Sequence, residues 1–311
     1  MKPTVVCVVG PTAVGKTKLG VEIARRFDGE VISGDSMQVY RGMDIGTAKV
    51  TDEEMMGVPH HMIDIKQPYE SFSVAEFQER VTRHIEEIHQ RGKLPVIVGG
   101  TGLYIQSVIY GYNFSDDKRD PEVSRKIEQE IDEKGIEYVY RQLQEIDPEQ
   151  AEKIHPNNSR RVVRALEVYR TTGKTMSELK AEQESESPYH PILIGLEMDR
   201  EQLYERINHR VDLMMVEGLR EEVQKLIAAG YGDAQSMKAI GYKEFLPYFN
   251  GESDLEETLD LLKRNSRRYA KRQLTYFRNK MDVQWYTIDP AEYHEKFQTI
   301  LRDLAGMIES T

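Results

Sequence analysis

The sequence has little cysteine and no long apolar run, and each absence excludes a class of protein. Its 311 residues include one cysteine, Cys7, so no internal disulfide can form. Cys7 lies in an apolar segment, where we expect a buried, inert thiol. No stretch approaches the roughly 20 apolar residues that span a bilayer, and no basic segment precedes the first apolar run, as one would in a signal peptide. We therefore expect a cytoplasmic protein with no membrane partner.

Acidic residues outnumber basic ones, 53 to 42, and the basic residues are unevenly distributed along the chain. The formal net charge is −11, which taken alone argues against a nucleic-acid partner. However, residues 153–174 hold six lysines and arginines against one acid, Glu167, and residues 263–280 hold eight against none. Such segregation lets a local basic face bind a polyanion while the acidic remainder keeps the protein soluble.

One segment fits the phosphate-binding pattern G-x-x-x-x-G-K followed by Ser or Thr, between a predicted strand and a predicted helix. Its residues are Gly10, Pro11, Thr12, Ala13, Val14, Gly15, Lys16 and Thr17. The glycines allow the backbone N–H groups to curl around an anion at the helix N-terminus. Lys16 can neutralise phosphate oxygens, and the Thr17 hydroxyl can ligate Mg²⁺. The pattern indicates a diphosphate or polyphosphate ligand, which need not be ATP.

Two further polar residues follow predicted strands. Residues 31–33 form a short apolar run that leads to Asp35, and residues 95–98 form another that leads to Thr101 among three glycines. Groups just after the carboxyl ends of strands line the ligand crevice of an open α/β sheet, so both residues are expected beside the phosphate loop. Each also has a structural interpretation: Asp35 as a turn or cap residue, and Thr101 as part of a tight strand-to-helix turn.

The order of these signals predicts an α/β fold, a P-loop-containing parallel sheet flanked by helices. Strand-like runs at 5–9, 31–33, 95–98, 191–196 and 285–288 are separated by helical periodicity. Between 113 and 190 the chain is charged and helical in period, with no strand signal. We therefore expect an α/β core over 1–112 and 191–311 and an all-helical insertion domain over 113–190, with a polar linker at 182–188.

Basic side chains are expected on exposed faces of two helices. The helix that begins near residue 159 has its apolar residues on one side, which leaves Arg160, Arg161 and Arg164 on the remaining arc. The helix that begins near residue 200 carries Arg206 and Arg210, which could fold over a bound phosphate.

The second basic segment also contains aromatic residues. Tyr269, Tyr276 and Phe277 lie within the run 264–278, and this mixture suits phosphate contacts combined with base stacking. Met214 and Met215, on the preceding long helix, are by contrast expected in the core.

Several motifs together resemble the tRNA dimethylallyltransferase family, most closely its bacterial members. They are the phosphate loop, Asp35-Ser36-x-Gln38-x-Tyr40, Gly99-Gly100-Thr101-Gly102-Leu103-Tyr104, Asn158-x-Arg160-Arg161-x-x-Arg164-Ala165-Leu166-Glu167 and Arg268-x-x-x-Arg272-Gln273-Leu274-Thr275. The resemblance runs through nearly the whole chain in the family's order. One departure is Tyr276, where the family usually has tryptophan, and a tyrosine ring can still stack.

The resemblance implies transfer of a dimethylallyl group from dimethylallyl diphosphate to N6 of the tRNA adenine 3′-adjacent to the anticodon, position 37, in tRNAs that read codons beginning with U. Asp35 is then the expected general base, and Thr101 is expected to hydrogen-bond the bridging oxygen of the donor. The phosphate loop, Arg206 and Arg210 are expected to hold the diphosphate, with Mg²⁺ as cofactor at Thr17. A monomer is expected.

The same resemblance assigns a set of residues to the tRNA, which the insertion domain and the second basic segment would grip at the anticodon arm. They are Ser36, Met37, Gln38, Tyr40, Arg160, Arg161, Arg164, Arg268 and Arg272.

From the residues alone, two other classes stay open. A nucleotide or small-molecule kinase uses the same phosphate loop with ATP, and a nucleic-acid-binding NTPase switch uses it without group transfer. The phosphate donor that binds distinguishes all three.

Overall fold

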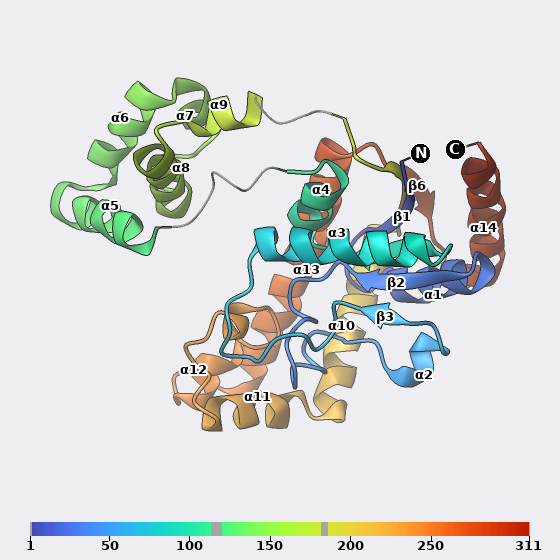
Figure 1. Cartoon of the computed structure of the whole chain (residues 1–311). Helices are drawn as coiled ribbons and strands as arrows, with labels where there is room; N and C mark the ends of the chain where they lie inside the picture. Colours follow the sequence, from blue (N-terminus) through green and yellow to red (C-terminus); the bar gives the residue numbers. More distant parts are fainter. Residues whose placement is uncertain (1, 113–119, 182–185, 311) are drawn as a thin grey trace. The chain divides into compact units, whose positions relative to one another are not determined.

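A parallel sheet forms the centre of the larger part of the molecule (Figure 1). The computed structural model describes residues 2–112, 120–181 and 186–310. Over these residues the sheet has six strands in the order β3-β2-β4-β1-β5-β6, and every neighbouring pair is parallel. The strands are β1 Thr4–Val9, β2 Gly29–Ser33, β3 His60–His61, β4 Leu94–Gly99, β5 His190–Glu197 and β6 Gln284–Thr287. The predicted fold class is confirmed, and only the two-residue β3 had no signal in the sequence.

The larger part of the molecule also contains helices, some of which pack on the sheet and others on neighbouring helices (Figure 1). They are α1 Lys16–Arg26, α2 Asp52–Met55, α3 Val74–Gln90, α4 Gly102–Ile109, α10 Arg200–Glu217, α11 Leu219–Ala228, α12 Phe245–Phe249, α13 Leu255–Lys280 and α14 Tyr293–Glu309, with a 3₁₀ turn at Ser236–Lys238. Side chains alternate along β1, so Val6 and Val8 enter one core cluster with Leu19 of α1 and Phe297 of α14. The buried Cys7 lies between them in sequence.

Helix starts follow the capping signals in the sequence. Ser73 accepts a hydrogen bond from the Glu76 N–H at 3.1 Å and so caps α3. The Glu76 carboxylate forms ion pairs with Lys66 and Arg80, both at 2.9 Å. Asp199 caps α10 by accepting from two backbone N–H groups at 2.9 and 3.2 Å. These caps fix where the chain enters the helices that surround the crevice.

The second compact unit is all-helical. The chain divides into Met1–Ile109 with Ser187–Thr311 as one unit and Tyr110–Glu186 as the other. The helices of the smaller unit are α5 Pro121–Lys134, α6 Ile136–Ile146, α7 Pro148–Glu152, α8 Ser159–Thr172 and α9 Met176–Ala181. They enclose their own apolar cluster, which includes Ile127, Val139 and Leu166. The expected boundary at 113 and most of the expected linker, 182–185, lie outside the described residues.

Within the described ranges, no helix combines the length and the apolar content needed to cross a bilayer.

Candidate active site

The phosphate loop joins β1 to α1 in a conformation that favours glycine. Gly10 and Gly15 have φ of +140° and +103°. A Cβ on Gly10 would lie 2.4 Å from the Leu196 carbonyl oxygen, so this position also requires glycine for close packing. Ala13 adopts φ of +65°, a strained value for a residue with a side chain. The predicted curl of the loop is therefore present.

Three side chains donate hydrogen bonds to carbonyl groups of the loop, one from within the loop and two from other helices. Lys16 donates through Nζ to the Pro11 carbonyl at 2.6 Å, and Arg206 donates through Nε to the Ala13 carbonyl at 3.0 Å. Tyr293 of α14 donates through its hydroxyl to the Val14 carbonyl at 2.7 Å, and the Arg206 guanidinium lies 5.6 Å from the centre of its ring. The loop is thus prearranged, with both cations beside it.

Burial shifts the proton affinity of the charged groups at the loop. Desolvation, reinforced by the nearby Arg210 cation, lowers the pKa of Lys16 to about 7, while Asp35 opposes that shift. Burial also lowers the pKa of Arg210. Two partly buried cations close together are costly, and an anionic ligand would relieve that cost.

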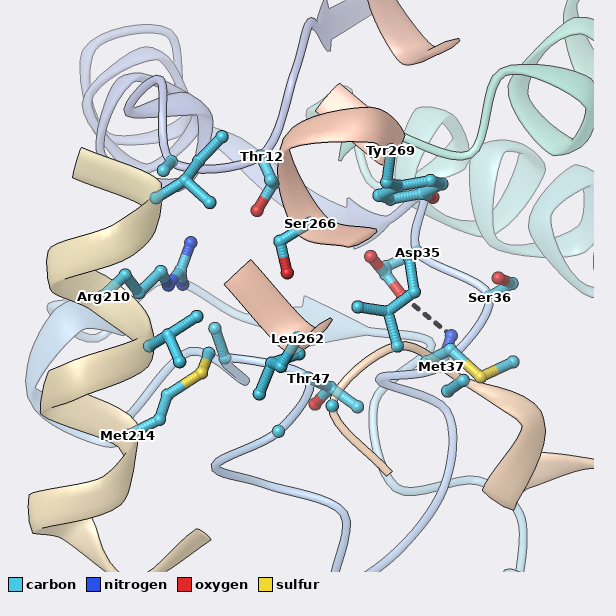
Figure 2. A pocket seen from close by; sticks show the side chains of 18 of the residues that line it. Thr12, Asp35, Ser36, Met37, Thr47, Arg210, Met214, Leu262, Ser266 and Tyr269 are labelled. Atoms are coloured by element: carbon cyan, nitrogen blue, oxygen red, sulfur yellow. Dashed lines mark hydrogen bonds between the residues drawn. The ribbon is translucent and has the colours of Figure 1, made fainter. Parts of the chain in front are cut away.

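Asp35 follows β2 and lies at the crevice, where both of its interpretations apply at once. Its carboxylate accepts from the Met37 N–H at 2.7 Å and the Gln38 N–H at 3.4 Å, which is a turn-capping arrangement (Figure 2). Burial raises the pKa of Asp35, although those two hydrogen bonds and Lys16 act in the opposite direction. A carboxylate with a raised pKa is a better proton acceptor than a solvent-exposed one.

Thr101 lies just behind this crevice. Its Oγ1 accepts from the Ser36 N–H at 3.2 Å, so the loops after β2 and β4 are tied together. The Tyr269 side chain of α13 hydrogen-bonds both Thr101 and Gln273, and burial together with Asp35 raises the pKa of Tyr269 to about 12. Thr101 itself lines neither of the cavities described next.

Two adjoining cavities of about 410 and 390 Å³ share one wall. The residues that line both are Thr12, Ala13, Asp35, Thr47, Ala48, Arg210 and Tyr269. The second cavity adds Lys16, Thr17 and Arg206, and we call it the anion arm. The first adds Ile207, Met214 and Leu262 among other residues, and we call it the apolar arm. Figure 2 shows Arg210 and Met214 on one helix, with Asp35 and Tyr269 across the cavity from them.

Known proteins resemble this chain over nearly its full length. A family model described as IPP transferase matches residues 38–280. A tRNA dimethylallyltransferase of Oceanobacillus iheyensis is 60% identical over 309 residues, which is 99% of each chain. The chain belongs to the IPP transferase family. The structure of a tRNA isopentenylpyrophosphate transferase from Bacillus halodurans has a TM-score of 0.75 and 52% identity and covers 100% of this chain and 98% of that one.

A more distant member of the family has also been solved. The structure of a eukaryotic dimethylallyltransferase acting on tRNA has a TM-score of 0.86 at 31% identity, covering 99% of this chain and 80% of that one. The fold of the IPP transferase family is therefore shared well beyond close sequence similarity.

Two residues at the crevice were given no role there by the sequence analysis. Met214, expected in the core, is half-buried and lines the apolar arm, so that expectation was wrong. Gln273 joins the phosphate loop to the loop after β4: its side chain accepts from the Thr12 N–H at 2.9 Å and donates to the Gly100 carbonyl at 3.1 Å. Helical spacing could have indicated both, because they lie four residues after Arg210 and Tyr269.

The residues after Asp35 do not share one role. Ser36 and Met37 line the apolar arm. Gln38 lines the anion arm, but its amide is engaged by Ser33 at 2.9 Å and by the Ala48 carbonyl at 3.2 Å. Tyr40 is fully buried, so its side chain is not available to a tRNA in this conformation.

The predicted tRNA-binding arginines of the smaller unit differ in exposure and pairing. Arg160 and Arg161 are exposed on α8. Arg164 pairs with Glu167 at 2.8 Å, and Glu167 is 2% exposed. Removing Arg164 would leave a buried carboxylate with less compensation, so its first effect is on stability.

On α13, too, some of the basic and aromatic side chains are exposed and others are buried. Arg268 and Arg272 are exposed, and the Arg272 guanidinium lies 5.6 Å from the centre of the Tyr269 ring. Tyr276 is half-buried and hydrogen-bonds Gln106. Phe277 is fully buried. The expectation that Phe277 takes part in base stacking was therefore wrong, because its ring belongs to the core.

Proposed function

We propose that this chain transfers the dimethylallyl group of dimethylallyl diphosphate to N6 of the adenine at position 37 of tRNAs that read codons beginning with U, releasing diphosphate. The observation that supports this assignment is the junction of the anion arm and the apolar arm at Asp35. A donor with a diphosphate and a short hydrocarbon matches both arms.

In this proposal the diphosphate lies against the phosphate loop, Lys16, Arg206 and Arg210. As the bond between C1 of the donor and the bridging oxygen breaks, its electron pair goes to the diphosphate, and these cations stabilise the charge that develops. Thr101 adjoins the crevice, and its hydroxyl, which donates to the Ser36 Oγ at 3.5 Å, would turn to donate to the bridging oxygen instead.

The acceptor side of the reaction requires a base. The lone pair of an exocyclic adenine amine is delocalised into the ring, so N6 is a weak nucleophile. As N6 forms a bond to C1, Asp35 accepts the proton that N6 loses. The adenine must leave the anticodon-loop stack to reach Asp35 in the crevice. The exposed Arg160, Arg161, Arg268 and Arg272 supply cations for the tRNA backbone.

Mg²⁺ is part of the proposal. Thr17 lines the anion arm, and its hydroxyl offers the kind of oxygen ligand that Mg²⁺ prefers. When bound, the ion would neutralise diphosphate charge, with the Thr17 hydroxyl as the protein ligand. We further propose that the protein is a monomer that acts in the cytoplasm.

Incubation of the protein with unmodified tRNA, Mg²⁺ and dimethylallyl diphosphate tests the proposed function. We expect nucleoside mass analysis to show N6-dimethylallyladenosine at position 37 and an equal amount of diphosphate. A parallel incubation with γ-labelled ATP tests the kinase alternative. Phosphoryl transfer without prenylation would refute the proposal.

The exposed arginines of α8 should bind tRNA phosphates. We expect the double change Arg160→Ala, Arg161→Ala to weaken tRNA binding and to flatten its dependence on salt concentration, by roughly one unit of logarithmic slope per lost contact at most. Filter binding between low and moderate salt measures the slope. Arg164→Ala is the matched comparison: we expect it to lower the melting temperature, because Arg164 pairs with the buried Glu167. An unchanged slope in the double variant would show that α8 faces away from the tRNA.

A further inference from the structure

One carboxylate outside both cavities collects hydrogen bonds from two distant parts of the chain. Glu222 of α11 accepts from the backbone N–H groups of Asp44 and Ile45, each at 2.9 Å, and from that of Gly46 at 3.1 Å. The Tyr242 hydroxyl donates to the same carboxylate at 2.6 Å. Glu222 lines neither the apolar arm nor the anion arm.

These four contacts require an ionised carboxylate. All of the groups that face Glu222 are donors, and a carboxylate is the side chain that only accepts. Successive backbone N–H groups that converge in this way form an anion-binding concavity, which here is filled by the protein's own side chain. Tyr242 is fully buried, and burial together with the charge of Glu222 raises its pKa, so the hydroxyl remains a donor.

The segment held by Glu222 continues directly into the wall of the crevice. Gly46 lines the apolar arm, and Thr47 and Ala48 line both arms. Gly46 is packed so closely that an added Cβ would lie 2.6 Å from the Tyr242 ring. On the other side, the Gln38 amide donates to the Ala48 carbonyl at 3.2 Å. The wall is therefore fixed from both sides, and Glu222 is its anchor from α11.

We propose that Glu222 is a positioning residue of the transfer site. By holding the backbone of residues 44–46 it sets the place of the wall formed by Gly46, Thr47 and Ala48, and so the width of the apolar arm opposite α10. The contact between Glu222 and residues 44–46 is observed in the structure. The identity of the ligand in the apolar arm rests on the proposed function. If this wall moves, binding of the hydrocarbon part of the donor should weaken, while the phosphate loop should keep its structure.

Glu222→Gln tests this inference, with Glu221→Gln as the matched control. Glu221 is the adjacent exposed carboxylate on the same helix, so the control makes the same charge change. In Glu222→Gln we expect amide hydrogen exchange of residues 44–46 to be at least about tenfold faster. Dimethylallyl diphosphate should bind about tenfold more weakly, while inorganic diphosphate binds within about twofold of wild type. Glu221→Gln should match wild type in all three measurements.

Each contrary result overturns a defined part of the inference. Unchanged exchange at 44–46 would show that Glu222 does not anchor the segment. Equal weakening of both ligands would show a general loss of structure instead of a displaced apolar wall. A wild-type protein that binds dimethylallyl diphosphate no better than diphosphate would overturn the proposed function, and the exchange result would still judge the anchor.

Tyr242→Phe keeps the experiment decisive if Glu222→Gln fails to fold. This change removes one of the four donors and retains the ring that packs on Gly46. We expect a three- to fivefold loss of dimethylallyl diphosphate affinity, about that of one hydrogen bond, again without a loss for diphosphate. Identical affinities and exchange in this variant and in wild type would overturn the proposal.

Discussion

Asp35→Asn should lower kcat by about 10²–10⁴-fold and leave the affinities for tRNA and donor nearly unchanged, because a general base acts in the transition state. Asparagine has nearly the same size and still accepts the Met37 N–H bond, which is 2.7 Å long in the native protein. The turn should therefore survive, and the melting temperature should change little. Single-turnover transfer rates, measured beside thermal melts, give both quantities.

Asp35→Ala separates catalysis from capping. Alanine removes the base and the turn contact together, so we expect the kcat loss of the asparagine variant plus a lower melting temperature. If Asp35 only capped the turn, the asparagine variant would transfer at a near-normal rate, and the alanine variant would merely be less stable. That result would remove Asp35 from the reaction.

The pH dependence of wild type gives a further check on Asp35. A base must be deprotonated to act, and burial raises the pKa of Asp35. The rate should therefore fall as pH decreases through this raised pKa. The acid limb should be absent from the residual activity of Asp35→Asn.

Lys16→Met should weaken donor binding by roughly 10- to 150-fold, which corresponds to the 1.5–3 kcal/mol of a hydrogen bond to a charged group. Methionine keeps most of the chain length and removes the cation beside the anion arm. Calorimetric titration with dimethylallyl diphosphate measures the loss. Lys225→Met is the control, because Lys225 is exposed on α11 and lines neither arm. Equal donor affinity in Lys16→Met and wild type would place the diphosphate elsewhere.

Lys16 also predicts a pH effect with a definite sign. Its pKa in the free protein is lowered to about 7, and a bound diphosphate favours the charged form and so raises it. Binding then takes up a proton above pH 7, so donor affinity should fall as pH rises from 7 to 9, by at most about tenfold per unit. The slope should vanish in Lys16→Met. If donor affinity in Lys16→Met still depended on pH, the proton taken up on binding would belong to another group.

The sequence by itself determined the elements and residues that depend on local order along the chain. The strand, phosphate loop and helix around Lys16 follow from a short pattern and its apolar flanks. Asp35 was assigned to the crevice because parallel strands end at one edge of a sheet. Thr101 was assigned there for the same reason, but it lies just behind the crevice and lines neither cavity. The helical insertion followed from a continuous helical period without strand signals. These inferences depend on the spacing of residues within one segment, which can be read from the sequence without knowledge of the fold.

Only the tertiary structure decided which side chains from distant segments meet. Met214 reaches the ligand cavity because α10 faces α13 across it, and Glu222 holds residues 44–46 across more than 170 positions of sequence. Arg164 is engaged by the buried Glu167, and Phe277 is taken up by the core. Helical spacing says which residues share a face. What that face packs against depends on burial and pairing between elements far apart in the chain, which no local pattern specifies.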